Sequence, residues 1–93
     1  MQYFVNWTQT KEGNAAKEGS KIQIMCYGEP VKSIMYGVYK DGYPVLVGQK
    51  DGGKAEFKLI RKGIDLKGDA VLKVTCYNDK WHAYGWKDEF IVF

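Results

Sequence analysis

The sequence has no continuous apolar run of the roughly 18 residues that a membrane-spanning helix needs, so we expect no membrane span. Its beginning also lacks the charged start, the apolar run and the small-residue cleavage site of a signal peptide. With two cysteines and one histidine, the chain has no paired CxxC or HxxxH spacing. We therefore expect neither a metal site nor a bound cofactor.

The sequence also lacks the short motifs of common enzyme active sites. It contains no GxSxG, no HExxH and no Walker-type loop. Cys76 and His82 would lie at opposite ends of a strand and its turn, so they do not form a nucleophile–base pair. The aspartates fall mostly in turns, where they cap the backbone, and the glutamates match solvated positions. These absences predict a protein that is not an enzyme.

The chain carries little excess of charge of either sign. Its net charge is +3, and its lysines are spread along the whole chain, usually close to an acidic residue. Proteins that bind nucleic acids concentrate positive charge on one face or along one element. We therefore expect no nucleic-acid partner.

Apolar and polar residues alternate with a period of two along much of the sequence, which is typical of half-buried β-strands. The alternating runs are residues 2–9, 20–27, 33–40, 54–62, 70–77 and 89–93. Turn signals that contain glycine, such as "KEGS", "KDGYP" and "KDGG", separate these runs. We predict an all-β, antiparallel two-sheet sandwich of about seven strands. Residues 1–93 are expected to form a single domain, because so short a chain has room for one core.

The inward faces of the alternating runs predict the hydrophobic core. In each run the apolar side chains alternate with polar ones, which places the apolar set on one side of the strand. The predicted core consists of Ile22, Ile24, Cys26, Ile34, Val38, Phe57, Leu59, Leu72, Val74 and Cys76.

Three stretches resemble successive landmarks of an immunoglobulin-like domain of the intermediate (I-set-like) type. "KEGSKIQIMCYGEP" is similar to that family's glycine turn and its second strand, which ends in cysteine. "YKDGYPV" looks like the hairpin after its third strand, and "FKLIRKGIDLKGDAVLKVTCYN" resembles its fifth and sixth strands with the partner cysteine. The resemblance covers residues 12–93 and implies an immunoglobulin-like β-sandwich.

The chain departs from that family's pattern near the expected core. No tryptophan stands near Val38, where the family has a buried one, and Val74 replaces the tyrosine that normally precedes the second cysteine by two positions. Asp69 lies one position too early for the aspartate of the same corner. We therefore expect an immunoglobulin-like sandwich rather than a member of the antibody family.

The resemblance implies a disulfide bond between Cys26 and Cys76. Both cysteines fall on the inward faces of their strands, as a bridge between two sheets requires. The alternative is a pair of reduced, buried cysteines that pack as small hydrophobic residues. Because disulfides persist in oxidising compartments, we expect an extracellular, cell-surface or virion-surface location, with the cytoplasm as the alternative for an unexported chain.

The stretch "NDKWHAYGWK", residues 78–87, gathers aromatic side chains around a glycine and the chain's only histidine. Alternation along a last strand would place Trp81 on the same face as Ala83 and Gly85. Because small neighbours suit a ring that packs inward, we predict that Trp81 belongs to the core. The alternative is a bulge at Gly85, which would shift the register by one and place Trp86 on the inner face with Trp81. The predicted binding surface is the opposite face with its polar neighbours: His82, Tyr84, Trp86, Asn78 and Asp79.

The resemblance and this surface predict a non-catalytic binding or structural display module, as found in adhesins, receptors and virion-surface proteins. A protein partner is favoured, because tryptophan and tyrosine bury a large area with few rotors. One alternative is a small carbohydrate-binding module in which sugar rings stack on Trp81, Tyr84 and Trp86. The others are a small inhibitor or accessory protein that blocks another macromolecule, and a mainly structural use of the aromatic residues. The sequence predicts no particular oligomeric state.

Overall fold

The computed structural model describes residues 4–14, 19–28, 30–59 and 70–91, and the regular structure of these residues is entirely β-strand. In chain order the strands are β1 (Val5–Lys11), β2 (Ser20–Cys26), β3 (Val31–Lys40), β4 (Tyr43–Asp51), β5 (Lys54–Leu59), β6 (Ala70–Asn78) and β7 (Ala83–Phe90). The prediction of an all-β chain is therefore confirmed.

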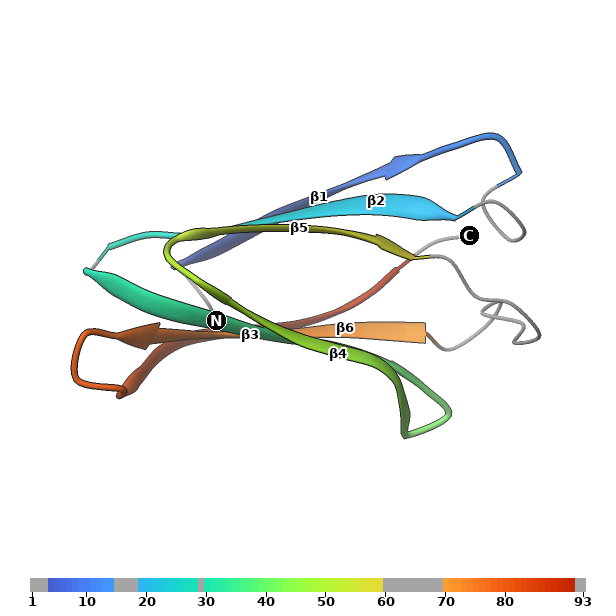
Figure 1. Cartoon of the computed structure of the whole chain (residues 1–93). Helices are drawn as coiled ribbons and strands as arrows, with labels where there is room; N and C mark the ends of the chain where they lie inside the picture. The colour runs from blue at the N-terminus through green and yellow to red at the C-terminus, as the bar shows by residue number, and fades with distance from the viewer. Residues whose placement is uncertain (1–3, 15–18, 29, 60–69, 92–93) are drawn as a thin grey trace.

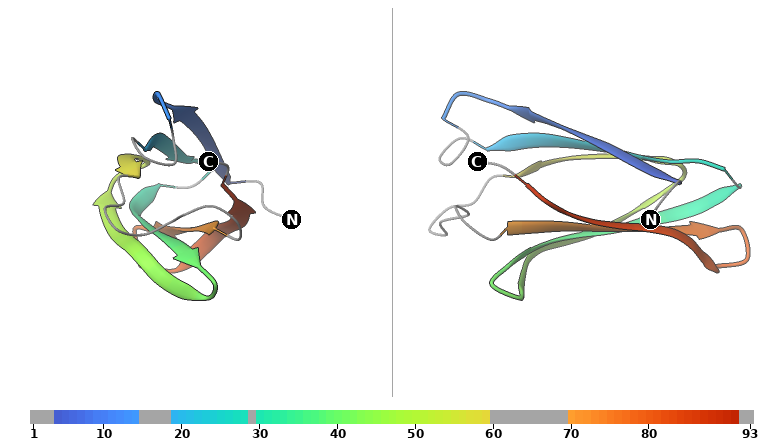
Figure 2. Two further views of the ribbon diagram at one scale, coloured as in Figure 1. Left: turned by 90° about the vertical axis from the view of Figure 1, so that its right-hand side faces the viewer. Right: turned by 180° about the vertical axis from the view of Figure 1, so that it is seen from behind.

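The strands form two antiparallel sheets that lie face to face (Figure 1). Sheet A has three strands in the order β1-β2-β5, and sheet B has four strands in the order β4-β3-β6-β7. The end-on view in Figure 2 shows the two layers, with β4 (green) and β7 (red) at opposite edges of sheet B. The predicted two-sheet sandwich is confirmed.

The core lies between the sheets and is built from the inward side chains of both. Of the ten residues predicted for it, all except Phe57 are buried, and Phe57 is partly buried against the others. Its ring stacks on Tyr36 from the opposite sheet, with the ring centroids 4.4 Å apart. The structure adds Val5, Ala55, Ala70 and Ile91 to the buried set.

A disulfide bond between Cys26 and Cys76 joins the two sheets through this core. Cys26 ends β2 in sheet A, Cys76 lies in β6 of sheet B, and their Cα atoms are 6.1 Å apart. Both side chains are buried, which confirms the inward orientation that the alternation predicted. The reduced alternative is not the state of this structure.

The alternating runs did not predict β4, which follows β3 after the tight turn Asp41–Gly42. Both turn residues have positive φ, 51° and 83°, as the short hairpin turns matched to strand twist require. Apolar residues occupy consecutive positions at the start of β4, so its sequence shows no period of two. The runs 2–9 and 54–62 extend partly outside the described residues, and the run 89–93 is not a separate strand, because β7 already reaches Phe90.

Candidate functional site

A tight turn joins β6 to β7 and orders the polar residues of the aromatic stretch. The backbone N–H of Asn78 donates to the carbonyl of His82 over 3.0 Å, and the N–H of Trp81 donates to the carbonyl of Asn78 over 2.9 Å. The side-chain Oδ1 of Asn78 accepts the N–H groups of Lys80 at 3.0 Å and of His82 at 2.9 Å. Asn78 therefore organises the turn, while Asp79 and His82 are exposed beside it.

Trp81 stands at the tip of this turn with its side chain 50% exposed, so the prediction that it belongs to the core is wrong. Its φ of 61° puts it in the left-handed region, where the alternation of a strand does not apply. The indole lies 6.1 Å from the ring of Tyr77, and the ammonium of Lys32 lies 6.0 Å from the indole centroid. Trp81 is thus an exposed ring with the Tyr77 ring beside it and the Lys32 ammonium over one of its faces.

Tyr84 packs inward, so its predicted place on the binding surface is also wrong. Ala83 pairs with Tyr77 and Gly85 pairs with Cys76, which leaves Tyr84 as the extra residue of a β-bulge. The bulge turns the Tyr84 ring toward the core, where it meets Phe4 edge-on at 5.5 Å. The neighbouring Gly85 is the sequence signal for this bulge, which turns Tyr84 inward and leaves Trp86 outward rather than bringing Trp86 to the inner face.

Trp86 follows the bulge and points away from the core, as predicted. It pairs with Thr75 and is 59% exposed. The pairing continues across sheet B in one row, from Trp86 through Thr75 and Met35 to Gln49. A neighbouring row runs from Asp88 through Lys73 and Gly37 to Val47. These two rows form the centre of the surface that we call the outer face of sheet B.

Gly37 allows a tyrosine ring to lie flat in the middle of the outer face of sheet B. A Cβ atom at position 37 would stand 2.8 Å from Cε1 of Tyr39, so the ring occupies the space that another side chain would fill. The ammonium of Lys73 lies 5.3 Å from the centroid of the same ring, within cation–π range. The Tyr39 ring therefore lies over Gly37, and the exposed side chains of Met35 and Val47 stand on the same face.

The sequence prediction therefore found one part of this surface and missed the rest. Trp86 is on it, whereas Asn78, Asp79 and His82 lie in the turn at one end of it. Met35, Tyr39 and Val47 were not predicted as binding residues. A signal for Met35 and Tyr39 was present, because the inward assignment of Ile34 and Val38 implies outward side chains at positions 35 and 39.

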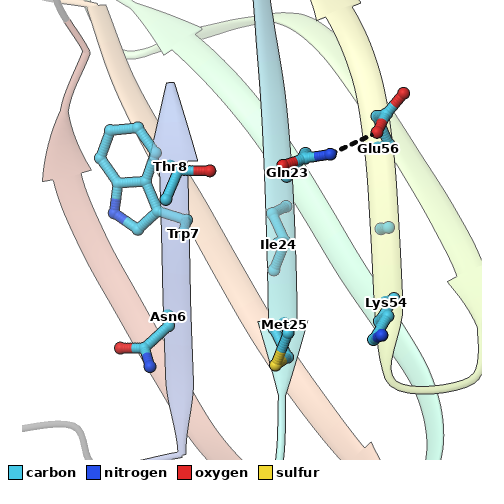
Figure 3. A pocket seen from close by; sticks show the side chains of 9 residues that line it. Asn6, Trp7, Thr8, Gln23, Ile24, Met25, Lys54 and Glu56 are labelled. Carbon is cyan, nitrogen blue, oxygen red and sulfur yellow. Dashed lines mark hydrogen bonds between the residues drawn. The ribbon is translucent and has the colours of Figure 1, made fainter. Parts of the chain in front are cut away.

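The outer face of sheet A is different in chemistry and contains a shallow hollow of about 420 Å³ (Figure 3). The outward side chains around the hollow are Asn6, Thr8, Gln23, Met25, Lys54 and Glu56. The Gln23 amide donates to Glu56 over 2.6 Å, and the Lys21 ammonium lies 3.1 Å from the same carboxylate. On this side of the hollow, Gln23 and Glu56 are therefore already engaged with each other and with Lys21.

The electrostatics of sheet A follow from these contacts. The hydrogen bond from Gln23, followed by the contacts of Lys21, holds the pKa of Glu56 below its ordinary value. Within the described residues, no group of three histidine, cysteine, aspartate or glutamate side chains could hold a metal ion. That same part of the chain has no helix with the length and apolar character to cross a membrane.

Comparisons of this chain with protein-family models, with curated proteins and with solved structures find no match. The candidate site therefore rests on its own geometry: a face of sheet B on which Trp86, Met35 and Val47 are exposed among polar and charged neighbours, with a tryptophan-bearing turn at one end.

Proposed function

We propose that this protein is a non-catalytic binding module that contacts a protein partner through the outer face of sheet B. The observation that carries the proposal is the gathering of exposed large side chains, Trp86, Met35 and Val47, in two adjacent rows of one sheet. Isolated exposed apolar residues are common, whereas contiguous ones mark sites of interaction. Tryptophan, tyrosine and methionine are the residue types enriched at protein interfaces.

A protein partner suits this surface better than a sugar. Sugar binding needs polar groups beside a free aromatic face, and the side-chain oxygen of Asn78 already accepts two backbone N–H groups. The ammonium of Lys32 lies over the indole of Trp81 and competes for one of its faces. The centre of the surface is aliphatic and aromatic, and its opposed charges, Lys73 and Asp88, face each other across neighbouring strands.

We also propose that the chain is an immunoglobulin-like domain of the intermediate type that works outside the cytoplasm. The features in support are a second strand that ends at Cys26, a tight hairpin after the third strand and a bridge from Cys26 to Cys76 in the sixth. A structural disulfide in a small domain suits an extracellular, cell-surface or virion-surface location.

The test is binding to a library of purified extracellular and cell-surface proteins, followed by affinity measurements with two variants. Trp86→Ala should weaken the Kd for a bound protein by about fivefold or more, because truncated hot-spot residues cost about 1 kcal/mol or more. Met25→Ala is the control, since Met25 is exposed on the outer face of sheet A. Loss of binding with Met25→Ala alone, or binding to a glycan array in place of any protein, would contradict the proposal.

A further inference from the structure

The strand β4 is an edge of sheet B whose free side carries backbone hydrogen-bonding groups. Among the described strands it pairs only with β3. The N–H of Gly52 donates to the carbonyl of Lys32, and bonded pairs alternate with non-bonded pairs along an antiparallel ladder, so Lys50 also faces β3. The N–H and C=O groups of Val47 and Gln49 therefore point away from β3, along the edge.

The other edges of the sandwich carry features that discourage pairing with another strand. Edge strands in monomeric proteins are usually guarded by charged side chains, by proline or by a covering segment. Charged residues occupy β5 (Lys54, Glu56, Lys58) and β7 (Lys87, Asp88, Glu89). At the remaining edge, β1 is tied to β7, because the indole N–H of Trp7 donates to the carboxylate of Glu89 over 3.0 Å.

By contrast, β4 is poorly guarded. Its first seven residues, Tyr43–Gln49, include no charged side chain. The side chain of Val47 is 66% exposed, and that of Tyr43 is more exposed still. Valine and tyrosine are residue types that strands usually pack against neighbouring side chains. Pro44 and a β-bulge at Val45 guard the strand near its beginning only. An apolar edge with outward-pointing backbone groups is the surface that accepts an added strand.

We propose that this edge binds a second copy of the same chain, with the two β4 strands antiparallel and Val47 opposite Val47 of the second copy. The charges of β4 favour this arrangement. It places Lys50 and Asp51 opposite the uncharged Pro44 and Tyr43 of the second copy. A parallel pairing would bring Lys50 beside Lys50 and Asp51 beside Asp51, and like charges on facing positions destabilise a strand pair.

The antiparallel arrangement also satisfies the backbone of both copies at once. A two-fold axis through the Val47 pair relates the two copies, so the same backbone groups of each β4 strand bond to their equivalents in the other copy. Such a symmetric contact joins two chains and does not continue into a filament. The two B sheets then form one continuous sheet, with their outer faces side by side. Two linked contact surfaces bind a multivalent partner more tightly than one surface does. The edge contact forms through the backbone of β4 and needs no partner on the outer face, although the Val47 side chain lies at the border of both surfaces.

Sedimentation equilibrium of the purified chain without any partner tests the proposal. The wild-type chain should sediment as a monomer–dimer equilibrium. Val47→Lys and Val47→Glu should each weaken dimerisation by about tenfold or more, because a like-charge pair replaces an apolar pair at the two-fold axis. An equimolar mixture of the two variants should restore it, since lysine then faces glutamate. Thr8→Lys, an exposed substitution on β1 of sheet A, is the matched control and should leave dimerisation unchanged.

Amide hydrogen exchange locates the contact. In the dimer, the amides of Val47 and Gln49 should be protected, and they should exchange quickly in Val47→Lys. The amide of Gly48 faces β3 and should be protected in both proteins. A wild-type chain that stays monomeric at millimolar concentration would overturn the proposal, as would a dimer insensitive to both variants. Failure of the mixture to restore the dimer would overturn the pairing of Val47 with its own copy.

Discussion

The outer faces of the two sheets are built by the same alternation but differ in what they offer to the solvent. On sheet A the outward side chains are mostly polar, and the exposed Met25 stands among groups such as Gln23 and Glu56 that bond to each other. On sheet B an outward methionine of nearly equal exposure, Met35, lies in a row with Trp86. A polar face can remain in water without a partner, whereas burying the apolar face gains free energy.

The comparison also shows why exposure of one residue does not identify a site. Met25 and Met35 are 45% and 43% exposed, so accessibility does not distinguish them. Their neighbours do: Lys54 pairs opposite Met25 in sheet A, while Met35 shares its face with the Tyr39 ring. What separates the two faces is that several exposed apolar side chains share neighbouring rows of sheet B, whereas Met25 stands among polar side chains on sheet A.

The largest expected effect is a loss of stability on removal of the Cys26–Cys76 disulfide bond, which joins the two sheets. Replacing both Cys26 and Cys76 with alanine should lower the free energy of unfolding by about 4 kcal/mol, since the bridge closes a loop with a sequence separation of 50. Denaturation in urea measures the loss. A loss under about 1 kcal/mol would mean that packing alone holds the sheets together.

A smaller effect separates the two sides of β7. Tyr84→Ala should cost about 2 kcal/mol of stability, because it removes a ring that packs on the core and on Phe4. Trp86→Ala should change stability by less than about 0.5 kcal/mol, as expected for an exposed side chain. Thermal and urea unfolding of the two variants side by side give the difference. The reverse order would mean that the bulge at Tyr84 is wrongly placed.

Trp81 provides a matched pair of substitutions at the end of the outer face of sheet B. Trp81→Ala and Trp81→Gly both remove the contacts with Tyr77 and Lys32, so their difference reports the backbone alone. The glycine variant should be the more stable by about 1 kcal/mol, because the φ of 61° penalises any residue with a Cβ atom. Equal stabilities in urea unfolding would show that the turn does not hold this conformation.

The smallest effect lies on sheet A and concerns Glu56. Its pKa in the folded state is lowered by the Gln23 hydrogen bond and by Lys21, so the ionised carboxylate stabilises the fold at pH above its unfolded-state pKa. This contribution is lost as the pH falls through the folded-state pKa. Gln23→Ala should raise the pKa of Glu56 toward its ordinary value in an NMR titration. An unchanged titration curve would assign the shift to Lys21 alone.

The sequence predicted the sandwich and nearly all of its core, because alternation and burial are the same signal in a two-layer fold. It predicted the exposure of Trp86 but inverted Trp81 and Tyr84. A left-handed turn residue and a bulge each break the alternation. Gly85 signals a bulge, but nothing in "WHAYGW" fixes which side chain the bulge turns inward or marks Trp81 as left-handed. The alternation missed β4, because apolar residues occupy consecutive positions at its start, although the resemblance implied a hairpin at "YKDGYPV".

The most direct test of the central claim is a comparison of Met35→Lys with Met25→Lys. The two methionines have matched exposure on opposite faces, so both lysine variants should fold with similar melting temperatures. Calorimetric titration with a protein selected by binding to the wild-type chain gives the Kd of each. The account predicts that Met35→Lys weakens binding by about tenfold or more and that Met25→Lys leaves it within about twofold of wild type. Equal affinities of the two variants, or a loss confined to Met25→Lys, would contradict it.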